Sequence, residues 1–543
     1  MIKLSKNQNS KKRAIVFCAF GLSGAAALIY EVLWARTLSL VFGNTVYAVS
    51  TMLTAFMAGL SLGAFIGGKL TDKTNNHLFL FGVFELGIAL FGLATFPLIK
   101  ILPSIYIYAY KNLNLSFYSF CLIQFILSFL IMVIPTSLMG ATFPVVSKIV
   151  TNKLTSLGED IGNIYSVNTF GSIAGSFLAG FVLIPIMGIT KTAIIAALLN
   201  LIAASSVLFL SKSKHLFKIL GGGIMFFLLL SISIAASSPK PVLNNFYTLS
   251  EQNLDKYLKT IFNEENVNGI VYVFYNSING ERSLQVDGKF EGSTGPQDMS
   301  TQLMLAHLPI LSHPNPKNFL NIGLGTGYTV KTALEYPLKQ ICCVEINPAV
   351  VRAARQCFNE NIFLDPRLNL VIADARNYLT VEEKKYDIIS SEPSYPTVSS
   401  VSNLFTLEFY KIVESRLSEN GIFCQWIPYY LLQDKDVVFM LKTFNTVFNH
   451  TYIWKTAQWK DYKGGDLLFI GSKTPFKYTA EQIEQRVRAR IDYPFYLSKT
   501  PEQVREITKG NDIPLNTDDK PMLEFTTPRN YITGLSHMRS MYR

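Results

Sequence analysis

Long apolar stretches separated by short polar connections fill the first 238 residues, and this pattern predicts membrane-spanning helices. A spanning helix needs about 20 mostly apolar residues. Stretches of that length centre near Ala25, Ala55, Ile88, Leu127, Ala174, Leu198 and Phe227. We therefore expect residues 1–238 to form a transmembrane bundle of about seven helices. The first stretch is longer than the apolar part of a signal peptide and lacks a cleavage site, so we expect it to be retained.

Glycines recur at four-residue spacing in two of these stretches. Gly59, Gly63 and Gly67 lie in the second stretch, and Gly171 and Gly175 lie in the fifth. Such spacing puts the glycines on one face of a helix, where a second helix can approach closely. We expect tight helix packing at both places.

Three ionisable residues interrupt the apolar stretches. Glu31 and Arg36 lie in the first stretch, and Glu85 lies in the third. An ionisable group in hydrocarbon is costly and often functional, although a long side chain such as Arg36 can extend to the interface. Glu31 and Glu85 either pair inside the bundle or line a path for a cationic substrate.

The loop cations predict the orientation of the bundle. The side of the N-terminus carries Lys3, Lys6, Lys11, Lys12, Arg13, Lys69, Lys73, Lys148, Lys153, Lys212, Lys214 and Lys218, against Arg36, Lys100, Lys111 and Lys191 on the opposite side. Cations concentrate on the cytoplasmic side, so we expect a multi-pass protein of the cell (inner) membrane with a cytoplasmic N-terminus. An odd number of spans puts the C-terminal domain outside. If one segment is re-entrant and does not span the membrane, the C-terminal domain lies on the cytoplasmic side instead. Residues 121–150, which contain Pro135 and Pro144, are the candidate for such a segment.

After Pro239 the pattern becomes that of a globular domain, which we expect over residues 245–543. Alternating apolar residues over 271–286 surround an Asn-Gly pair at 279–280 and predict a β-hairpin. A helix is expected at 299–311. We divide this domain into a β-hairpin part (265–295), a nucleotide-binding part (296–475) and a C-terminal extension (476–543).

A strand that runs into a glycine-rich turn and then a helix is the strongest local signal. The strand begins at Phe319, the turn holds Gly323, Gly325 and Gly327, and the helix begins near Tyr328. Glycines let the backbone approach a ligand, and the helix N-terminus lies behind them.

Acidic residues follow the next strands. Strand 341–345 ends in Glu345, strand 368–373 precedes Asp374, and strand 387–391 precedes Glu392. Acids at successive strand ends line the binding crevice of a doubly wound sheet. Each acid alone would suit a helix cap equally well. The expected fold is therefore an α-helical transmembrane bundle followed by an α/β Rossmann-like domain of the S-adenosylmethionine methyltransferase type, with an N-terminal β-hairpin.

Composition agrees with a membrane protein. Hydrophobic residues make up 49% and charged residues 16% of the chain, whereas soluble proteins carry about 25% charged residues. The net charge of +11 is explained by cations in the loops that orient the protein in the membrane. The chain has no cluster of basic residues interleaved with aromatic residues, so we do not expect nucleic acid binding. The six cysteines have no spacing that suits zinc or a disulfide framework, so we expect reduced thiols and no metal site.

The glycine spacing G-x-G-x-G resembles the nucleotide motif of S-adenosylmethionine-dependent transferases. More specifically, residues 269–476 resemble the spermidine synthase (polyamine aminopropyltransferase) family, in its bacterial branch with a fused membrane bundle. The bundle itself resembles, more weakly, half of a major facilitator-type transporter. The matching stretches are VDG at 286–288, HLP at 307–309, GLGTG at 323–327, VEINP at 344–348, ADA at 373–375, YDII at 386–389, SEPSYP at 391–396, NLFTLEFY at 403–410, LNTDDKP at 515–521 and LEF at 523–525.

The resemblance implies transfer of an aminopropyl group from decarboxylated S-adenosylmethionine to an amine, and a dimer or larger assembly. It implies that Glu392 is the catalytic base, that Glu345 binds ribose and that Asp374 binds adenine. The remaining implied donor contacts are Gly323, Gly325, Thr326, Gly327 and Ala375. The implied substrate contacts are Asp298, Gln302, His307 and Tyr395, although His307 also suits a packed or capping role.

Several positions depart from the family pattern. Thr326 replaces an Asp that faces the donor's amine and repels the carboxylate of ordinary S-adenosylmethionine. Glu392 replaces the catalytic Asp, and Tyr395 replaces a second Asp of the same loop. Thr301 and Leu303 replace a Tyr and a Glu that hold the polyamine, and Gly269 replaces a Gln that contacts the donor. The donor half of the site therefore matches the family better than the polyamine half.

These departures leave three hypotheses. The first is a membrane-bound aminopropyltransferase that acts on an amine. The second is an S-adenosylmethionine-dependent methyltransferase, which Thr326 would permit. The third is a transporter or sensor whose C-terminal domain binds a nucleoside or a polyamine without turnover.

Overall fold

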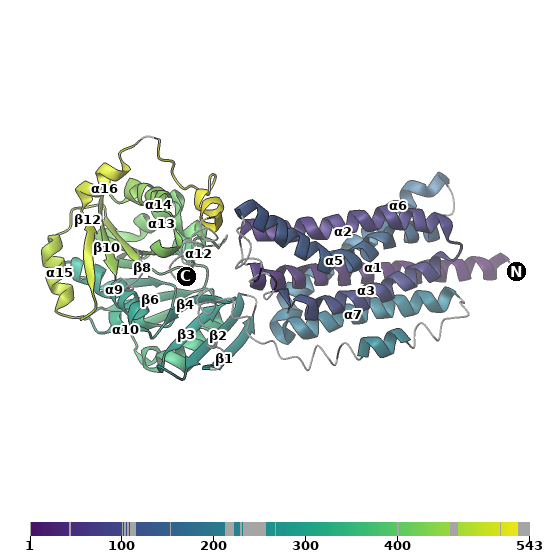
Figure 1. Cartoon of the computed structure of the whole chain (residues 1–543), viewed down its shortest axis with the longest axis horizontal. Helices are drawn as coiled ribbons and strands as arrows, with labels where there is room; N and C mark the ends of the chain where they lie inside the picture. Colours follow the sequence, from purple (N-terminus) through teal and green to yellow (C-terminus); the bar gives the residue numbers. More distant parts are fainter. Residues whose placement is uncertain are drawn as a thin grey trace. The chain divides into compact units, whose positions relative to one another are not determined.

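The computed structural model describes residues 2–42, 45–99, 101–102, 105, 108, 116–151, 154–211, 222–228, 231, 257–266, 268–398, 401–456, 465–510 and 512–529. The chain divides into two compact units (Figure 1). The first contains Met1–Gly43 and Tyr47–Val242, and the second contains Leu243–Arg543.

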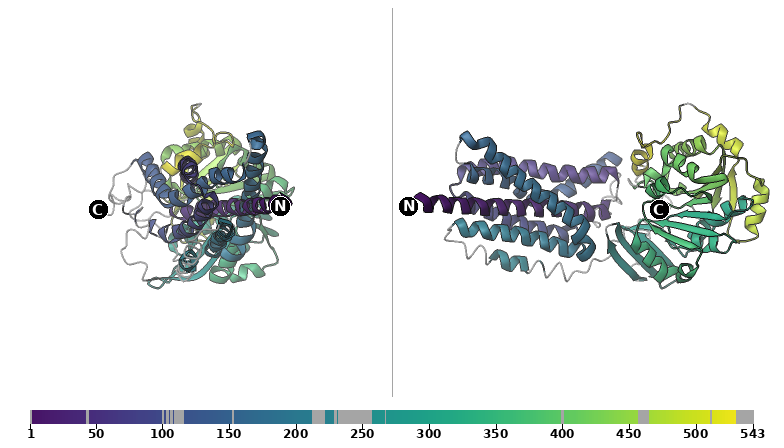
Figure 2. Two further views of the ribbon diagram at one scale, coloured as in Figure 1. Left: turned by 90° about the vertical axis from the view of Figure 1, so that its right-hand side faces the viewer. Right: turned by 180° about the vertical axis from the view of Figure 1, so that it is seen from behind.

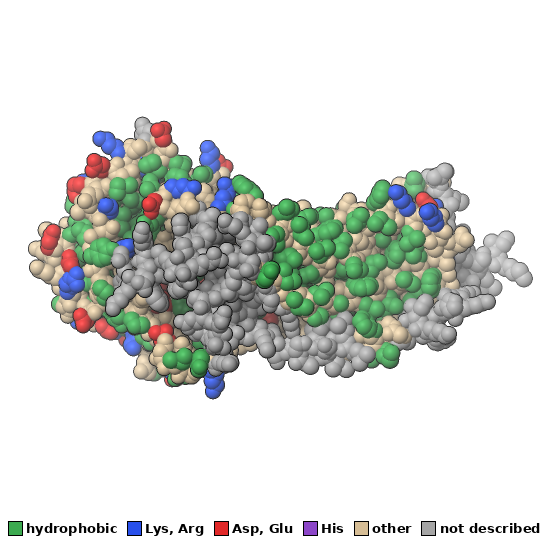
Figure 3. Space-filling model, in the orientation of Figure 1, with side chains coloured by type: hydrophobic (Ala, Val, Ile, Leu, Met, Phe, Trp, Pro, Cys, Tyr) green, Lys and Arg blue, Asp and Glu red, His purple; other side chains and the backbone are tan. Residues whose placement is uncertain are grey.

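The first unit consists of long helices that run side by side (Figures 1 and 2). They are α1 (Ile2–Phe42), α2 (Val46–Lys73), α3 (His77–Ile99), α5 (Phe117–Val150), α6 (Leu157–Leu178) and α7 (Ile184–Ser211). Hydrophobic side chains are spread along the described part of this unit on the face shown in Figure 3, and charged side chains there lie near its ends. Five helical segments are long and apolar enough to cross a membrane: Ser10–Ser39, Val46–Lys73, His77–Ile99, Phe117–Val150 and Leu157–Ser211.

Five such segments are fewer than the seven stretches of the sequence analysis for two reasons. The segment Leu157–Ser211 contains both α6 and α7. A π-helical turn at Ala179–Leu183 and a break at Gly188, whose φ is 76° and ψ 173°, separate these two helices, and both pack on α1. The stretch around Phe227 lies largely outside the described residues.

The glycines at four-residue spacing pack against neighbouring helices, as predicted. A Cβ atom on Gly63 would lie 1.9 Å from the carbonyl oxygen of Ser137, so α2 and α5 meet backbone to backbone. A Cβ atom on Gly171 would lie 2.0 Å from the carbonyl oxygen of Gly21, which joins α6 to α1 in the same way. A Cβ atom would also lie 1.9 Å from Thr136 Oγ1 at Gly59, 2.5 Å from Ala141 Cβ at Gly67 and 2.2 Å from the Ala25 carbonyl oxygen at Gly175.

Glu85 is fully buried in the bundle and has a partner that the sequence analysis did not predict. The amide Nδ2 of Asn200 donates a hydrogen bond of 2.7 Å to Glu85 Oε2. Glu31 is half-buried. The partner of Glu85 that the structure describes is therefore a neutral amide from α7, and the pairing of Glu31 with Glu85 stays a prediction.

The second unit begins with a small antiparallel sheet. Its strands are β1 (Leu258–Asn266), β2 (Gly269–Asn276), β3 (Arg282–Val286) and β4 (Lys289–Ser293), paired in that order. The pair β2–β3 is the predicted hairpin, and Gly280 takes a φ of 75° in its turn. Strands β1 and β4 extend the hairpin on both sides, which the sequence analysis did not predict.

The larger sheet has eight strands in the order β12-β10-β11-β9-β8-β5-β6-β7. Neighbours among β7, β6, β5, β8 and β9 are parallel, and β11, β10 and β12 add antiparallel strands. The strand order reverses between β5 and β8, and ligands of such sheets bind at the carboxyl ends of the strands beside this point. The strand bounds are β5 Asn318–Ile322, β6 Gln340–Glu345, β7 Leu368–Ile372, β8 Tyr386–Ser391, β9 Leu417–Ile427, β10 His450–Thr456, β11 Leu467–Ser472 and β12 Phe495–Lys499.

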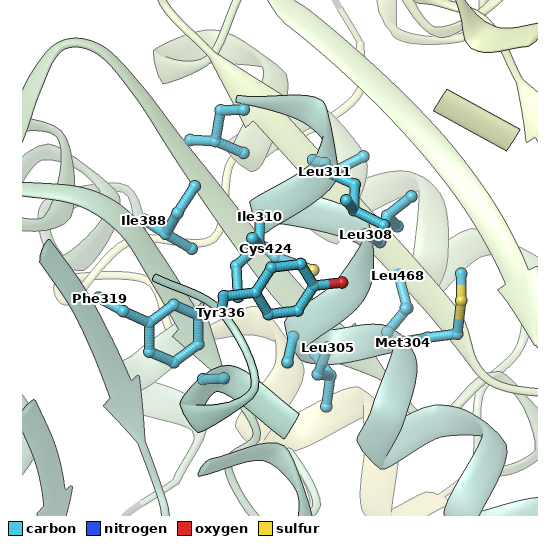
Figure 4. Close-up of a cluster of buried hydrophobic side chains, with 14 of the residues drawn as sticks. Met304, Leu305, Leu308, Ile310, Leu311, Phe319, Tyr336, Ile388, Cys424 and Leu468 are labelled. Atoms are coloured by element: carbon cyan, nitrogen blue, oxygen red, sulfur yellow. The ribbon is translucent and has the colours of Figure 1, made fainter. Parts of the chain in front are cut away.

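Helices pack on both faces of the larger sheet. Helices α9 (Pro296–Ser312), α10 (Tyr328–Leu334) and α15 (Ala480–Arg488) share one buried cluster with the strands, part of which is shown in Figure 4. Helices α12 (Ala375–Val381), α13 (Leu407–Arg416), α14 (Asp434–Val447) and α16 (Pro501–Thr508) share the cluster on the other face. Helix α11 (Pro348–Ala353) packs on the small sheet.

Candidate active site

A cavity of about 790 Å³ lies at the carboxyl ends of the parallel strands. Its walls come from the small sheet, from the start of α9, from the loops after β5, β6, β7 and β8, and from residues next to β9 and β11. The cavity therefore occupies the position that the strand order predicts for a ligand.

The glycine turn after β5 forms one wall. Gly323 has a φ of 85°, and a Cβ atom there would lie 2.6 Å from the carbonyl oxygen of Glu392. Only glycine fits this approach between the ends of β5 and β8. Gly325 (φ 53°) also lines the cavity, whereas Gly327 (φ 86°) precedes α10 and is not among the lining residues that the structure describes.

Glu345, at the end of β6, is buried and lines the cavity. Its Oε2 accepts a 2.9 Å hydrogen bond from the Leu324 backbone, and its Oε1 accepts a 2.8 Å bond from the Asn347 backbone. Burial raises the pKa of this carboxyl, and the backbone N–H groups oppose that shift. Glu345 thus joins the glycine turn to the end of β6.

Asp374 has two roles in the structure. Its Oδ1 accepts a 2.8 Å hydrogen bond from the Asn377 backbone, so it caps the N-terminus of α12. It also lines the cavity together with Ala375. Asp374 therefore caps α12 and also lies in the wall of the cavity, so the capping role does not exclude a contact with a ligand.

Glu392 follows β8 and lines the cavity. Its Oε2 accepts a 3.0 Å hydrogen bond from Thr329 Oγ1. Burial raises the pKa of Glu392 to about 8; the Thr329 hydroxyl opposes this, and the charges of Asp466, Asp298 and Glu291 add to it. Without a cation nearby, this carboxyl keeps its proton at neutral pH.

Asp298 and Gln302 line the cavity from the first turns of α9. Asp298 Oδ2 accepts a 2.5 Å hydrogen bond from Ser293 Oγ. Burial raises the pKa of Asp298 to about 7. Gln302 Nε2 donates a 3.0 Å bond to the Ser293 carbonyl.

Thr326 does not face the cavity as its place in the glycine turn suggested. Its side chain is 1% exposed, and its hydroxyl donates a hydrogen bond to Gln302 Oε1. Among the described residues that line the cavity, Gln302 appears and Thr326 does not. Thr326 therefore acts on the site through Gln302, because the turn directs its side chain toward α9.

His307 is not brought to the cavity. It lies farther along α9, buried, with Nδ1 2.6 Å from the Tyr336 hydroxyl. Burial and the charge of Arg490 lower its pKa to about 4. His307 is a packed neutral histidine, because its turn of α9 faces the core and not the strand ends.

Aromatic side chains form a wall that the sequence analysis captured only in part. Tyr395 was expected, and its ring lies 5.7 Å from Trp426 and 6.5 Å from Tyr430. The Tyr430 hydroxyl donates a 3.3 Å hydrogen bond to the Tyr395 hydroxyl. Trp426 and Tyr430 were not among the expected site residues, yet all three rings line the cavity.

Asp466 is the main residue that sequence reasoning missed. It precedes β11 and lines the cavity, and Thr301 Oγ1 donates a 2.5 Å hydrogen bond to its Oδ2. Burial raises its pKa to about 6. The only sequence signal was an acid next to two glycines before a strand, far from the glycine turn.

Seven acidic residues are among those that line the cavity, and we call four of them, Glu291, Asp298, Glu392 and Asp466, the acidic cluster, because the charges of the other three raise the pKa of Glu392. Burial and the neighbouring acids raise the pKa of Glu291 as well, against the charge of Lys289, and its Oε1 accepts a 2.8 Å bond from Ser394 Oγ. Acids placed so close together favour shared protons or a bound cation. The cluster can hold a cationic amine and accept a proton from it.

Comparison with known proteins gives a consistent result. The family model described as the spermine/spermidine synthase domain matches residues 299–479. Polyamine aminopropyltransferase 2 of Aquifex aeolicus (strain VF5) is 24% identical over 492 residues, which cover 88% of this chain and 91% of that protein. That match extends over both units.

A second relative has a higher identity over a shorter stretch. The polyamine aminopropyltransferase of Thermoanaerobacter sp. (strain X514) is 30% identical over 228 residues, which cover 41% of this chain and 78% of that protein. Among solved structures, the spermidine synthase from Thermotoga maritima is 23% identical with a TM-score of 0.37, over 52% of this chain and 88% of its own.

Proposed function

Because the chain belongs to the spermine/spermidine synthase family of polyamine aminopropyltransferases, we propose that its second unit transfers an aminopropyl group from decarboxylated S-adenosylmethionine to an amine. The observation that carries this proposal is the acidic cluster beside the glycine turn. A polyamine is a polycation, and partly buried carboxylates in a shared cavity bind such a substrate.

The donor would bind at the ends of β5, β6 and β7. The glycine turn, with Gly323 and Gly325, would let the nucleoside approach the backbone. Glu345 would accept hydrogen bonds from the ribose hydroxyls, and Asp374, followed by Ala375, would bind the adenine. Each acid has a backbone bond that fixes its orientation before the donor arrives.

The reaction is a substitution at carbon. The neutral amine of the acceptor attacks the aminopropyl methylene carbon that is bonded to the sulfonium. A C–N bond forms, and the C–S bond to that carbon breaks. The electron pair of the C–S bond stays on sulfur, which leaves as the neutral thioether methylthioadenosine. Because the sulfonium is a good leaving group, the protein has to position the amine and remove its proton, and Glu392 would accept that proton.

Thr329 can support Glu392 in both protonation states. Its Oγ1 lies 3.0 Å from Glu392 Oε2 and 3.0 Å from the Gln302 carbonyl, and the hydroxyl has a single proton. When Glu392 is ionised, Thr329 donates to it. When Glu392 is protonated, it can donate to Thr329, which then donates to Gln302. A base that cycles between the two states needs such a partner.

The first unit would anchor the enzyme in the cell membrane. Five of its helical segments have the length and composition for this, and the Aquifex match covers the same part of the chain. Fractionation of cells that make the full chain would check the assignment: the protein should stay with membranes after a high-salt wash and enter solution only with detergent.

The function is tested with the purified full chain in detergent. The protein is incubated with diaminobutane and either decarboxylated S-adenosylmethionine or S-adenosylmethionine, and the products are identified by mass spectrometry. Methylthioadenosine and an aminopropylated amine are expected with the first donor only. The family has an acid at the position of Thr326, and that acid repels the carboxylate of S-adenosylmethionine. Since Thr326 carries no charge, S-adenosylmethionine is not repelled in this way. A methylated product with the second donor would therefore establish the methyltransferase alternative.

A further inference from the structure

The C-terminal extension contains a segment, residues 516–523, that bonds the stretch leading into α13, and we call it the C-terminal segment. Asn516 is fully buried. Its Nδ2 donates a 2.9 Å hydrogen bond to the Phe405 carbonyl, and its own backbone carbonyl accepts a 2.9 Å bond from the Leu407 N–H. Its Oδ1 accepts a 3.2 Å bond from the Leu523 N–H. Asn516 therefore joins the C-terminal segment to the start of α13 and closes the segment on itself.

Asp518 joins the C-terminal segment to α12 by an ion pair. The Arg376 guanidinium donates to both carboxyl oxygens, with Nη1 2.8 Å from Oδ1. The same Nη1 lies 3.2 Å from the Asn403 carbonyl oxygen and 3.4 Å from Thr406 Oγ1, and the Thr406 hydroxyl also bonds Asp518. The hydrogen bonds from Arg376 lower the pKa of Asp518, so the pair is ionised at neutral pH. Arg376 thus links α12, the C-terminal segment and the stretch leading into α13.

The two parts that the C-terminal segment joins both contribute to the wall of the cavity, although the segment itself is not among the described lining residues. Val401 and Leu404 line the cavity from the stretch leading into α13, and Asp374 and Ala375 line it from the start of α12. The Leu404 carbonyl also accepts a 3.0 Å hydrogen bond from Gln425 Nε2 on β9. The bonds of the C-terminal segment therefore fix two parts of one wall relative to each other.

This wall is the part of the cavity where the nucleobase of the donor would bind. Asp374 offers hydrogen-bond acceptors, and Ala375, Val401 and Leu404 offer apolar surface. A flat heterocycle such as adenine needs both, because its edge is polar and its faces are apolar. A wall that is fixed before the ligand arrives binds it more tightly, since binding then costs less conformational entropy.

The acidic cluster is held by other parts of the fold. Its described hydrogen-bond partners come from β4, α9, α10, β9 and the loop after β8. Because none of these elements belongs to the C-terminal segment, a change in the segment should act on the donor half of the cavity and leave the acidic cluster in place.

We propose that Asn516 and Asp518 are positioning residues for the donor: they hold Leu404 and Asp374 at the spacing that its nucleobase requires. This inference rests on the proposed function and assigns a role in it to the C-terminal extension. Neither residue touches the donor, so both act through the wall that they fix.

The test measures KM for each substrate with the purified full chain in detergent. Asp518 is exposed, so Asp518→Asn should fold. Its KM for decarboxylated S-adenosylmethionine is expected to rise about 2- to 5-fold, the factor that corresponds to one exposed ion pair. KM for diaminobutane and kcat should stay the same. The matched control is Asp519→Asn, which makes the same change at the next residue, an exposed acid outside the cavity, and should change neither KM.

Two further variants separate positioning from stability. Asn516→Ala should raise KM for the donor about 5- to 10-fold, which corresponds to the loss of one buried hydrogen bond. Arg376→Gln combined with Asp518→Asn should raise it no more than Arg376→Gln alone, because both changes break the same ion pair. The proposal is overturned if Asp518→Asn leaves KM for the donor unchanged or raises KM for both substrates equally, or if the effects of Arg376→Gln and Asp518→Asn add.

A separate measurement keeps this inference distinct from the proposed function. If no amine is aminopropylated, the proposed function fails, and calorimetric binding of methylthioadenosine, which carries the same nucleobase, decides the role of the C-terminal segment. Weaker binding to Asp518→Asn than to Asp519→Asn would support it. Equal affinities, or no binding to either variant, would overturn it.

Discussion

Glu392 is the residue on which the chemistry depends. Its pKa is raised to about 8 by burial and by neighbouring acids, and Thr329 is the side chain that donates a hydrogen bond to it among the described residues. An acid held this way can accept a proton from an ammonium group whose own charge draws the carboxyl toward ionisation. The extra methylene relative to an Asp extends the carboxyl farther from β8.

Replacement of Glu392 by Gln should lower kcat by about 10²- to 10⁴-fold, because general-base catalysis contributes that much. Donor affinity should change little, since Glu345 and Asp374 remain. Product formation is measured by mass spectrometry and donor binding by calorimetry. Glu484, which is half-buried, pairs with Arg488 outside the cavity, so Glu484→Gln is the control. Unchanged turnover in Glu392→Gln would remove its role as base.

At the scale of elements, the glycine turn makes a prediction with a built-in comparison. Gly323 and Gly325 both have a positive φ, but a Cβ atom on Gly323 would meet the Glu392 carbonyl at 2.6 Å, whereas Gly325 has nothing within 4 Å. Gly325→Ala should lower the free energy of unfolding only by the cost of a left-handed backbone for alanine, about 1–2 kcal/mol. Gly323→Ala should cost more and reduce activity more, because β5 and β8 must move apart. Thermal unfolding and turnover of both variants decide the point, and equal losses would contradict it.

Helix α2 offers a similar comparison in the bundle. A Cβ atom on Gly63 would meet the Ser137 carbonyl at 1.9 Å, whereas one on Gly68 would meet nothing within 4 Å. Gly63→Ala should lower the melting temperature of the full chain in detergent, because α2 and α5 must separate. Gly68→Ala should leave it unchanged or raise it, since alanine favours a helix over glycine by about 0.5–1 kcal/mol. A lower melting temperature in both variants would argue against the packing.

The strands and helices around the site were largely predictable from the local pattern. The glycine turn, the helix from Tyr328 and the strands that end at Glu345 and before Glu392 all occur where they were expected. Strand β1 and the facing direction of Thr326 were not predictable. The first depends on pairing with β2, and the second depends on how α9 packs beside the turn.

At the scale of the molecule, the acidic cluster couples stability to pH. Burial raises the pKa of Glu392 to about 8 and that of Asp298 to about 7, above the ordinary values near 4. Between about pH 4 and about pH 8 these carboxyl groups bind more protons in the folded protein than in the unfolded chain. The free energy of unfolding therefore falls as pH rises through this interval. The contribution is fully present below about pH 4 and is lost as pH passes the raised values.

The melting temperature of the full chain in detergent should therefore decrease from about pH 5 to about pH 8, and added diaminobutane should restore part of it at the higher pH, because a cation binds the ionised acids. Glu392→Gln should weaken this dependence. A melting temperature that rises over the same interval, or that ignores diaminobutane, would contradict the electrostatics of the cavity.

The amino-acid sequence by itself determined the apolar helices, the glycine turn and the acids at the strand ends, because these features depend on neighbours a few residues away. Only the tertiary structure decided which side chains share the cavity. It brought in Asp466, Trp426 and Tyr430 from strands far along the chain and left His307 in the core. The reason is that β9 and β11 reach the carboxyl edge through long-range pairing, which no local pattern of residues encodes.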